Sequence, residues 1–251
     1  MENEEIICIR DLHRNFQVGS EIVHALNGVT FSICKGEFVS IMGTSGSGKS
    51  TLLNILGCLD TPTSGEYILN GNSVGNLNKN QLSTLRNRLI GFVFQNYNLL
   101  ARTSALDNVE LPLLYNREVS AKERKERAEA ALEAVNLTDR MHHMPNQLSG
   151  GQQQRVAIAR AIVNDPVIIL ADEATGNLDT RTSYEIMTLF QELHSKGKTI
   201  AFVTHEPDIA TFTTRTIKLR DGDIVKDEPI AKQSAAQALA EYEKNLKSSV
   251  I

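Results

Sequence analysis

The chain contains the glycine-rich stretch Gly43-Thr44-Ser45-Gly46-Ser47-Gly48-Lys49-Ser50 between two apolar segments. Residues 38–42 before it are typical of a buried strand, and residues 51–56 after it have the pattern of a helix. A strand, a glycine-rich loop and a helix in this order match the spacing of a P-loop. Glycines let the backbone wrap closely around a phosphate chain, and the free N–H groups at the start of the helix attract it. The stretch therefore predicts nucleotide binding by the residues from Gly43 to Thr51.

Two side chains in this stretch have distinct expected roles. Lys49 is expected to reach the β- and γ-phosphates, and the Ser50 hydroxyl is expected to bind Mg²⁺. The alternative is a glycine-rich turn that merely ends a strand. The strand before the loop and the helix after it argue against that alternative.

Length, composition and charge limit the classes of protein that the sequence allows. The chain has 251 residues, of which 41% are hydrophobic and 22% are charged, as in a soluble globular protein. Its formal net charge of −4 argues against a broad nucleic-acid surface, so no nucleic-acid partner is expected. No apolar run approaches the roughly 20 residues that span a bilayer, and the acidic N-terminus has no signal-peptide pattern. Cys8, Cys34 and Cys58 are interpreted as reduced thiols of a cytoplasmic protein.

The rest of the sequence alternates segments typical of strands and of helices. The opening residues 6–33 predict several short strands, and therefore an antiparallel β layer beside the nucleotide site. Residues 167–171 and 199–204 predict buried parallel strands. The segment at about 96–147 is mainly helical in pattern. The predicted fold class is α/β: a P-loop NTPase core with a mixed β-sheet, an antiparallel β subdomain and an inserted α-helical subdomain.

This fold class suggests one domain with a short appendage. Residues 1–229 are expected to form a single nucleotide-binding domain, and residues 230–251 a C-terminal helical tail. Asp221-Gly222 is a strong turn signal and predicts a hairpin near the end of the domain.

Two adjacent carboxylates follow the buried strand at 167–171. Asp172 is expected to hold Mg²⁺ and its water ligands, and Glu173 to act as general base toward the attacking water. His205 ends the next buried strand, where a histidine could contact a γ-phosphate. A lone histidine in such a place is more often structural, and this alternative stays open from the residues alone.

Three further candidates are weaker when each is considered by itself. Ser149-Gly150-Gly151-Gln152 opens a helix and offers a second anion site, although the same pattern is a common helix cap. Gln95 follows an apolar strand and could reach a ligand there, although a glutamine in such a place is more often an ordinary polar loop residue. Phe16 could stack on a nucleotide base, while its position alone favours a core or surface aromatic.

Taken in order, these motifs resemble those of the ATP-binding cassette (ABC) family. The resemblance covers about residues 6–227 and includes the P-loop, Gln95, the signature at 148–152, the strand ending in Glu173, Asn177-Leu178-Asp179 and His205. Residues 54–60 and 94–100 are similar to those of the subgroup of macrolide exporters and lipoprotein-releasing ATPases.

The resemblance implies a mechanism in which two copies pair head to tail and enclose ATP with Mg²⁺. It implies that Ser149, Gly150, Gly151 and Gln152 bind the ATP held by the other copy's P-loop. It further implies that Phe16 stacks on adenine and that Gln95 contacts Mg²⁺ and water. Asp179 would connect the two active sites, and His205 would hold the γ-phosphate.

The sequence departs from the family at one position beside the general base. The family usually has proline after the catalytic glutamate, whereas Ala174 follows Glu173 here. Proline would fix φ, so alanine is expected to leave this turn slightly looser. No membrane domain is expected in this chain, so the resemblance implies a separate membrane permease partner and a location on the inner face of the membrane.

Two functional classes remain open at this point. One is a transport ATPase that moves a lipoprotein, a peptide or a macrolide-like drug, or that drives machinery mechanically. The other is a regulatory or scaffolding ATPase that couples ATP state to the cell envelope or division machinery. DNA-repair and translation cassettes fit worse, because residues 96–147 are too few for a long coiled coil and because the chain has one P-loop.

Overall fold

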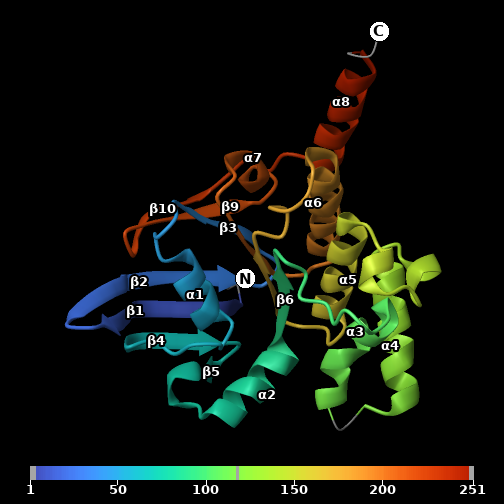
Figure 1. The fold of residues 1–251 in the computed structure, drawn as a ribbon. Helices are drawn as coiled ribbons and strands as arrows, with labels where there is room; N and C mark the ends of the chain where they lie inside the picture. The colour runs from blue at the N-terminus through green and yellow to red at the C-terminus, as the bar shows by residue number, and fades with distance from the viewer. Residues whose placement is uncertain (1–3, 117–118, 249–251) are drawn as a thin grey trace.

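The computed structural model describes residues 4–116 and 119–248. Its strands form two sheets, and its helices gather mainly on one side of the larger sheet (Figure 1). The first three residues of the acidic N-terminus and residues 249–251 of the predicted tail lie outside the described residues. Within the described residues, no helix is long and apolar enough to cross a membrane.

The larger sheet has six strands in the order β10-β9-β3-β8-β7-β6. All its neighbouring pairs are parallel except the hairpin of β9 and β10, which confirms the turn predicted at Asp221-Gly222. In the order of the chain, these strands are β3 (Phe38–Gly43), β6 (Ile90–Phe94), β7 (Ile168–Asp172), β8 (Ile200–Thr204), β9 (Arg215–Arg220) and β10 (Asp223–Pro229).

The smaller sheet is antiparallel, with the order β2-β1-β4-β5. It contains β1 (Glu5–Val18), β2 (Glu21–Cys34), β4 (Ser64–Leu69) and β5 (Asn72–Ser73). The prediction of several short strands at the N-terminus is wrong, because β1 and β2 are each 14 residues long. The pairing of β1 with β2 shifts register near Leu12 and Arg14. These irregularities interrupt the alternation of polar and apolar residues, so one long strand looks like two in the sequence.

The helices between β6 and β7 come from the predicted helical insert and the signature region. Helix α5 begins directly after Ser149 and ends before β7, and α4 packs against it. The chain contains α1 (Lys49–Leu56), η1 (Val74–Asn76), α2 (Lys79–Leu89), α3 (Ala105–Glu110), η2 (Leu111–Tyr115), α4 (Ala121–Ala134), η3 (Thr138–Arg140), η4 (Pro145–Gln147), α5 (Gly150–Ile162), α6 (Thr180–Ser195), α7 (Pro207–Ala210) and α8 (Ala235–Ser248).

Two hydrophobic cores lie on opposite faces of the six-stranded sheet. Two successive residues of β7 show the division. Ile168 belongs to the core shared with α1 and the antiparallel sheet, and Ile169 belongs to the core shared with α3–α6. Because side chains of a strand point alternately to its two faces, a continuous apolar run is needed where both faces are covered. The sheet is therefore covered by packed side chains on both faces. Because its strands β3, β6, β7, β8 and β9 are parallel, their carboxyl ends lie at one edge of the sheet.

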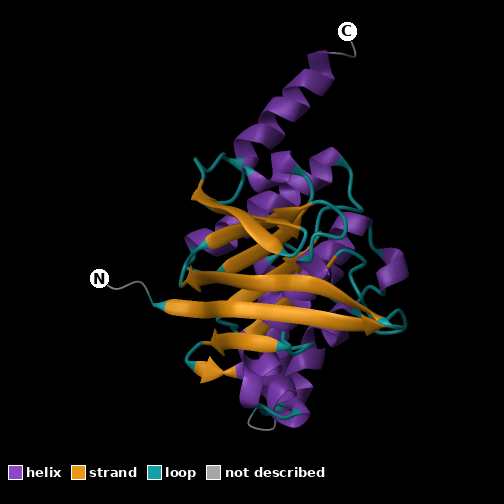
Figure 2. Ribbon diagram, turned by 90° about the vertical axis from the view of Figure 1, so that its left-hand side faces the viewer, coloured by secondary structure: helices purple, strands orange, loops and turns teal. Residues whose placement is uncertain are grey.

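The last helix projects away from both layers. Helix α8 packs against α6, and its C-terminal part extends beyond the rest of the molecule (Figures 1 and 2). A helix is therefore present within the predicted tail of residues 230–251, at residues 235–248.

Candidate nucleotide-binding site

The loop between β3 and α1 has a backbone that depends on glycine. Gly46 has a φ of 78° and Gly48 a φ of 100°, both in the left-handed region that favours glycine. A Cβ on Gly48 would lie 2.5 Å from the carbonyl oxygen of Ala25, so any larger residue would collide with β2. Among the described residues, no side chain caps the start of α1, which leaves its first N–H groups available to an anion.

Lys49 lies folded into this loop. Its side chain is largely buried, and its Nζ donates to the carbonyl oxygens of Gly43 and Thr44 at 2.8 Å each. These bonds keep the ammonium at the mouth of the loop, where a phosphate chain can replace the two carbonyl groups as its partner.

A cavity of about 920 Å³ opens over the loop at the carboxyl ends of β3, β7 and β8. This is the edge at which parallel α/β sheets bind ligands. Most of the sequence-predicted P-loop residues line it, together with the polar residues expected from the strand ends; among them are Gly43, Thr44, Ser45, Gly46, Gly48, Lys49, Ser50, Thr51, Gln95, Asp172, Glu173 and His205. Ser47 is buried beneath the loop, and its hydroxyl has no hydrogen-bond partner among the described residues.

Two carboxylates lie side by side where β7 ends. Burial raises the pKa of the Asp172 carboxyl, the adjacent Glu173 charge raises it further, and Lys49 acts in the opposite direction. Glu173 has a φ of 44°, which is unusual for a residue with a Cβ. Its carboxylate Oε1 lies 2.9 Å from His205 Nδ1, so the ends of β7 and β8 are joined by this pair.

Gln95 lines the same cavity and lies just after β6. Its Nε2 donates to Asn177 Oδ1 at 3.4 Å, and Asn177 Nδ2 donates back to the Gln95 carbonyl oxygen at 3.2 Å. Gln95 therefore connects the start of the helical insert to the loop that follows Glu173.

The signature residues do not face the P-loop of their own chain. Ser149 caps α5, since its Oγ accepts from Gln152 N at 3.3 Å and Gln152 Oε1 accepts from Ser149 N at 2.9 Å. Among the described residues that line the P-loop cavity, none belongs to the 149–152 segment. Gly151 lies beside α6, because a Cβ there would be 2.5 Å from Thr182 Cγ2.

Asp179 begins α6 next to this segment. Its Oδ1 accepts from Thr182 N at 3.0 Å, and its Oδ2 accepts from the Thr182 hydroxyl at 2.6 Å. These hydrogen bonds lower the pKa of Asp179. The exposed starts of α5 and α6 thus lie side by side and outside the cavity.

Phe16 lies near the cavity without lining it. The residue is opposite Val23 in the pairing of β1 with β2, and Val23 lines the cavity. The guanidinium carbon of Arg14 lies 4.5 Å from the centre of the Phe16 ring, so a cation covers part of that ring. Phe16 is 37% exposed.

Sequence reasoning missed two basic residues of the cavity wall, His24 and Lys218. Lys218 lies on β9 directly opposite Met42, the residue before the P-loop. The sequence carried no signal for it, because the neighbours of β3 in the sheet are not encoded by any local pattern.

Comparisons with known proteins agree with this arrangement. A family profile of ABC transporters matches residues 26–176. The uncharacterized ABC transporter ATP-binding protein YknY of Bacillus subtilis is 55% identical over 220 residues, which cover 88% of this chain and 95% of YknY. The macrolide export ATP-binding/permease protein MacB of Chlorobium phaeobacteroides is 52% identical over 234 residues, which are 93% of this chain and 35% of MacB.

A solved structure shares this architecture over most of the chain. The dimeric post-hydrolysis state of the ATP-binding cassette MJ0796, bound to ADP and Pi, superposes with a TM-score of 0.82 at 46% identity. The match covers 90% of this chain and 100% of that one. The fold class predicted from the sequence and the predicted family, including its likeness to macrolide exporters, are confirmed. The chain belongs to the ABC transporter family, in which it is an ATP-binding cassette that hydrolyses ATP.

Proposed function

We propose that this ATPase works as a homodimer attached to a separate membrane permease. Residues 1–229 form its nucleotide-binding domain, and α8 belongs to a C-terminal tail. The observation that carries the proposal is the convergence of Lys49, Glu173 and His205 on one cavity at the ends of parallel strands. The energy of ATP binding and hydrolysis drives the permease.

The chain's own residues divide the chemistry among them. Lys49 and the free N–H groups of α1 bind the phosphate chain. Glu173 accepts a proton from the water that attacks the γ-phosphorus, and ADP leaves with the bridging oxygen. His205 keeps the Glu173 carboxylate in place through the 2.9 Å pair and contacts the γ-phosphate.

The residues present suit Mg²⁺ as well as ATP. Mg²⁺ prefers oxygen ligands and usually binds through one or two carboxylates together with substrate phosphates. The Ser50 hydroxyl, the Asp172 carboxylate and the Gln95 amide oxygen are available for it on the cavity wall. When bound, the ion neutralises phosphate charge, and its charge would also favour the ionised form of the half-buried Asp172.

The second copy completes the site. Ser149, Gly150, Gly151 and Gln152 open a helix but lie outside the cavity of their own chain, which supports a role against the ATP of the partner. The dimeric state of the MJ0796 cassette supports the same pairing. In this arrangement Phe16 stacks on adenine, and Asp179 links the two sites across the dimer.

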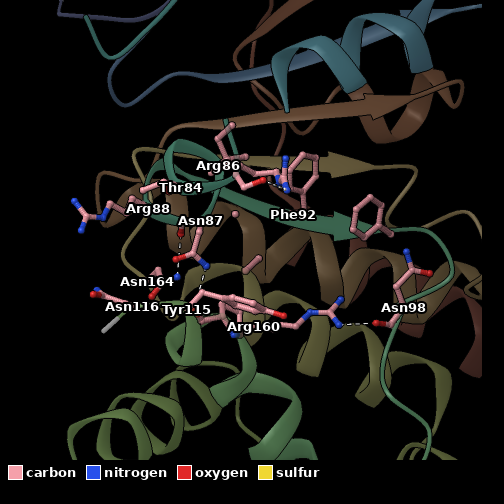
Figure 3. Close-up of a pocket in the computed structure, with 16 residues that line it drawn as sticks. Thr84, Arg86, Asn87, Arg88, Phe92, Asn98, Tyr115, Asn116, Arg160 and Asn164 are labelled. Carbon is pink, nitrogen blue, oxygen red and sulfur yellow. Dashed lines mark hydrogen bonds between the residues drawn. The ribbon is translucent and has the colours of Figure 1, made fainter. Parts of the chain in front are cut away.

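A second cavity, of about 850 Å³, is the proposed docking surface for the permease. It lies between α2, β6, η2 and α5, close to the segment that Gln95 opens (Figure 3). Tyr115 at its rim is 74% exposed, and Arg160 on its wall donates to the carbonyl oxygens of Tyr97 at 2.7 Å and Asn98 at 2.6 Å. An exposed tyrosine and several arginines around such a cavity suit a protein segment, because Tyr and Arg are enriched at protein interfaces.

Docking there would hold the cassette on the inner face of the membrane. The permease, which determines the cargo, would move a lipoprotein, a peptide or a macrolide-like drug, or would transmit force. The MacB relative contains both an ATP-binding and a permease part, as its name states, and this supports a membrane partner.

The test is the oligomeric state of Glu173→Gln, measured by light scattering with and without Mg-ATP. Loss of the general base should block hydrolysis and preserve binding, so a dimer is expected only with ATP. The double variant that carries both Glu173→Gln and Ser149→Arg should stay monomeric with Mg-ATP, although it still binds ATP. Ser120→Arg, at an exposed serine that caps α4, is the matched control and should leave the dimer intact. A dimer that survives Ser149→Arg would contradict the proposed role of the signature residues.

A further inference from the structure

One amide side chain outside the nucleotide cavity points at the turn that carries Glu173. Gln154 lies on α5 and is 0% exposed. Its Nε2 donates to the carbonyl oxygen of Ala174 at 2.7 Å. Ala174 directly follows Glu173 and is itself buried, at 2% exposed. A buried hydrogen bond of this length fixes the position of the peptide group between Ala174 and Thr175, one residue after the carboxylate residue.

The turn that receives this bond is conformationally strained. Glu173 has a φ of 44°, and a left-handed conformation is disfavoured for residues with a Cβ. Such a conformation persists only where the surrounding contacts hold it. Two backbone bonds contribute, from Glu173 N to the Val203 oxygen at 3.0 Å and from Gly176 N to the Glu173 oxygen at 2.9 Å. The Gln154 side chain adds a hydrogen bond to the carbonyl oxygen of Ala174, which lies in the chain between Glu173 and Gly176.

The other end of the same amide has no partner among the residues that the structure describes. Gln154 Oε1 is buried and accepts no hydrogen bond from the described residues. An unpaired buried acceptor destabilises a fold, and methionine would fill a similar volume without that penalty. The N–H groups of Gln154, which methionine lacks, therefore account for a glutamine at this position.

We propose that Gln154 is a positioning residue for ATP hydrolysis, because it holds the strained turn that aims the Glu173 carboxylate. This inference rests on the proposed role of Glu173 as general base. Gln154 is not a catalytic residue, because it lies among the buried residues behind the turn and outside the lining of the nucleotide cavity. It takes over part of the constraint that proline would supply at position 174.

The same hydrogen bond connects the signature residues, which are proposed to bind the partner's ATP, to Glu173, the proposed base for the ATP of its own chain. Helix α5 begins directly after its N-cap Ser149, and Gln154 lies on that helix about 1.4 turns beyond the cap. A displacement of Ser149 along the helix axis therefore moves Gln154 with it. The position of the signature motif is thus transmitted to the base of its own chain through one hydrogen bond.

The test compares Gln154→Met and Gln154→Asn in the full chain. Methionine keeps the volume and removes the donor, whereas asparagine keeps the amide but is too short to reach the Ala174 oxygen. For both, kcat for ATP is expected to fall by about tenfold, while KM and ATP affinity stay within about twofold. Because Gly176 N bonds to the Glu173 oxygen, its amide should exchange hydrogen faster in both variants.

Gln191→Met is the matched control for loss of a glutamine donor in a helix. Gln191 Nε2 also donates to backbone carbonyl oxygens, those of Phe212 and Gln233, but on α6 away from the cavity. Its kcat should stay within about twofold of the wild-type value. A drop in kcat as large as that of Gln154→Met would show that a general loss of packing explains both.

Two outcomes separate this inference from the proposed function. If Glu173→Gln is inactive and both Gln154 variants keep the wild-type kcat, the positioning role is refuted and the base stands. If Glu173→Gln hydrolyses ATP at the wild-type rate, the proposed base is wrong, and the positioning role fails with it. A variant that does not fold leaves the other variant to decide, because asparagine retains the polarity and methionine retains the volume.

Discussion

His205 Nδ1 lies 2.9 Å from Glu173 Oε1, across the ends of two neighbouring parallel strands. The histidine is exposed, whereas the Glu173 side chain is only 25% accessible. A carboxylate that must accept a proton from water needs one oxygen free and a fixed orientation. Within the part of the chain that the structure describes, the pair uses Oε1 and leaves Oε2 without a partner, and it determines where Oε2 points.

His205→Ala is therefore expected to lower kcat for ATP by about tenfold to a hundredfold, because both the orientation of Glu173 and the proposed phosphate contact are lost. Steady-state hydrolysis at saturating ATP measures the change. His142→Ala, at an exposed histidine in the segment between η3 and η4, should retain the wild-type rate. An unchanged kcat in His205→Ala would reduce the pair to a structural contact.

Asp172→Asn should stabilise the nucleotide-free protein at pH 7.5 while abolishing hydrolysis. Burial and the neighbouring Glu173 raise the pKa of Asp172, so the folded state holds its proton more tightly than the unfolded state does. The stability that the protonated Asp172 contributes is fully present below the ordinary Asp pKa. It is lost as pH rises through the raised pKa that Asp172 has in the folded state. At pH 7.5 the buried charge therefore destabilises the fold, and removing it should raise Tm.

Asp179→Asn is expected to change stability in the opposite direction and serves as the comparison. The Thr182 hydrogen bonds lower the pKa of Asp179, so its stabilising effect is present above the ordinary Asp pKa and is lost as pH falls through the lowered value. Thermal melts at pH 7.5 give the sign of the change in Tm for each variant, and melts continued to about pH 3 follow how each difference changes with pH. An Asp172→Asn protein that melts below wild type at pH 7.5 would contradict the assignment.

Much of the fold was predictable because its signals are local. The P-loop, the apolar strand before Asp172 and the Asp221-Gly222 turn each depend on neighbouring residues, and all three are present. The lengths of β1 and β2 were not predictable in this way. Their register shifts are stabilised by pairing with a second strand and with β4, which the local alternation pattern does not record.

The candidate site shows the same division. Lys49 and Asp172 were found from motifs, since each lies at a fixed spacing from a glycine-rich loop or a strand end. Lys218 and Gln154 were missed, because the first depends on the order of strands in the sheet and the second on how α5 packs behind β7. Contacts between distant segments carry no signature within a single sequence.

Arg215 joins the two sheets and should be sensitive to even a conservative change. Its guanidinium donates twice to Asp227 at 2.7 Å, to Glu37 at 3.1 Å and to the Ser32 carbonyl oxygen of β2 at 2.9 Å. Lysine keeps the charge but cannot make this fork of bonds. Arg215→Lys is expected to lower the free energy of unfolding by about 1–3 kcal/mol, which is roughly 2–12 °C in Tm for a chain of this size.

Arg220→Lys is the matched control on the same strand. Its side chain is 75% exposed, and its Nε lies 3.6 Å from the carboxylate of Asp221. Exposed pairs of this kind contribute little, so Tm should change by at most about 2 °C. An equal fall in Tm in the two variants would mean that the junction between the two sheets does not depend on the hydrogen bonds of the Arg215 guanidinium.

Helix α8 is held on α6 by a small aromatic cluster, and its stability should depend on one ring. Tyr242 packs edge-on against Tyr184 with ring centres 6.1 Å apart, and Tyr184 packs in turn against Phe212 at 5.6 Å. Glu243 adds a 3.0 Å ion pair with Arg181. Tyr242→Ala removes the ring but leaves the ion pair, so it should cost about 1–2 kcal/mol.

Because α8 projects beyond the rest of the molecule, this loss should appear as local unfolding of the helix before global unfolding (Figure 2). Hydrogen exchange should accelerate across residues 235–248 in Tyr242→Ala, while β7 and β8 keep their protection. Lys244→Ala, at an exposed neighbour on the same helix, should leave the exchange of α8 unchanged. If α8 and the strands lost protection together, α8 would be a cooperative part of the core, and its contact with α6 would stabilise the nucleotide site itself.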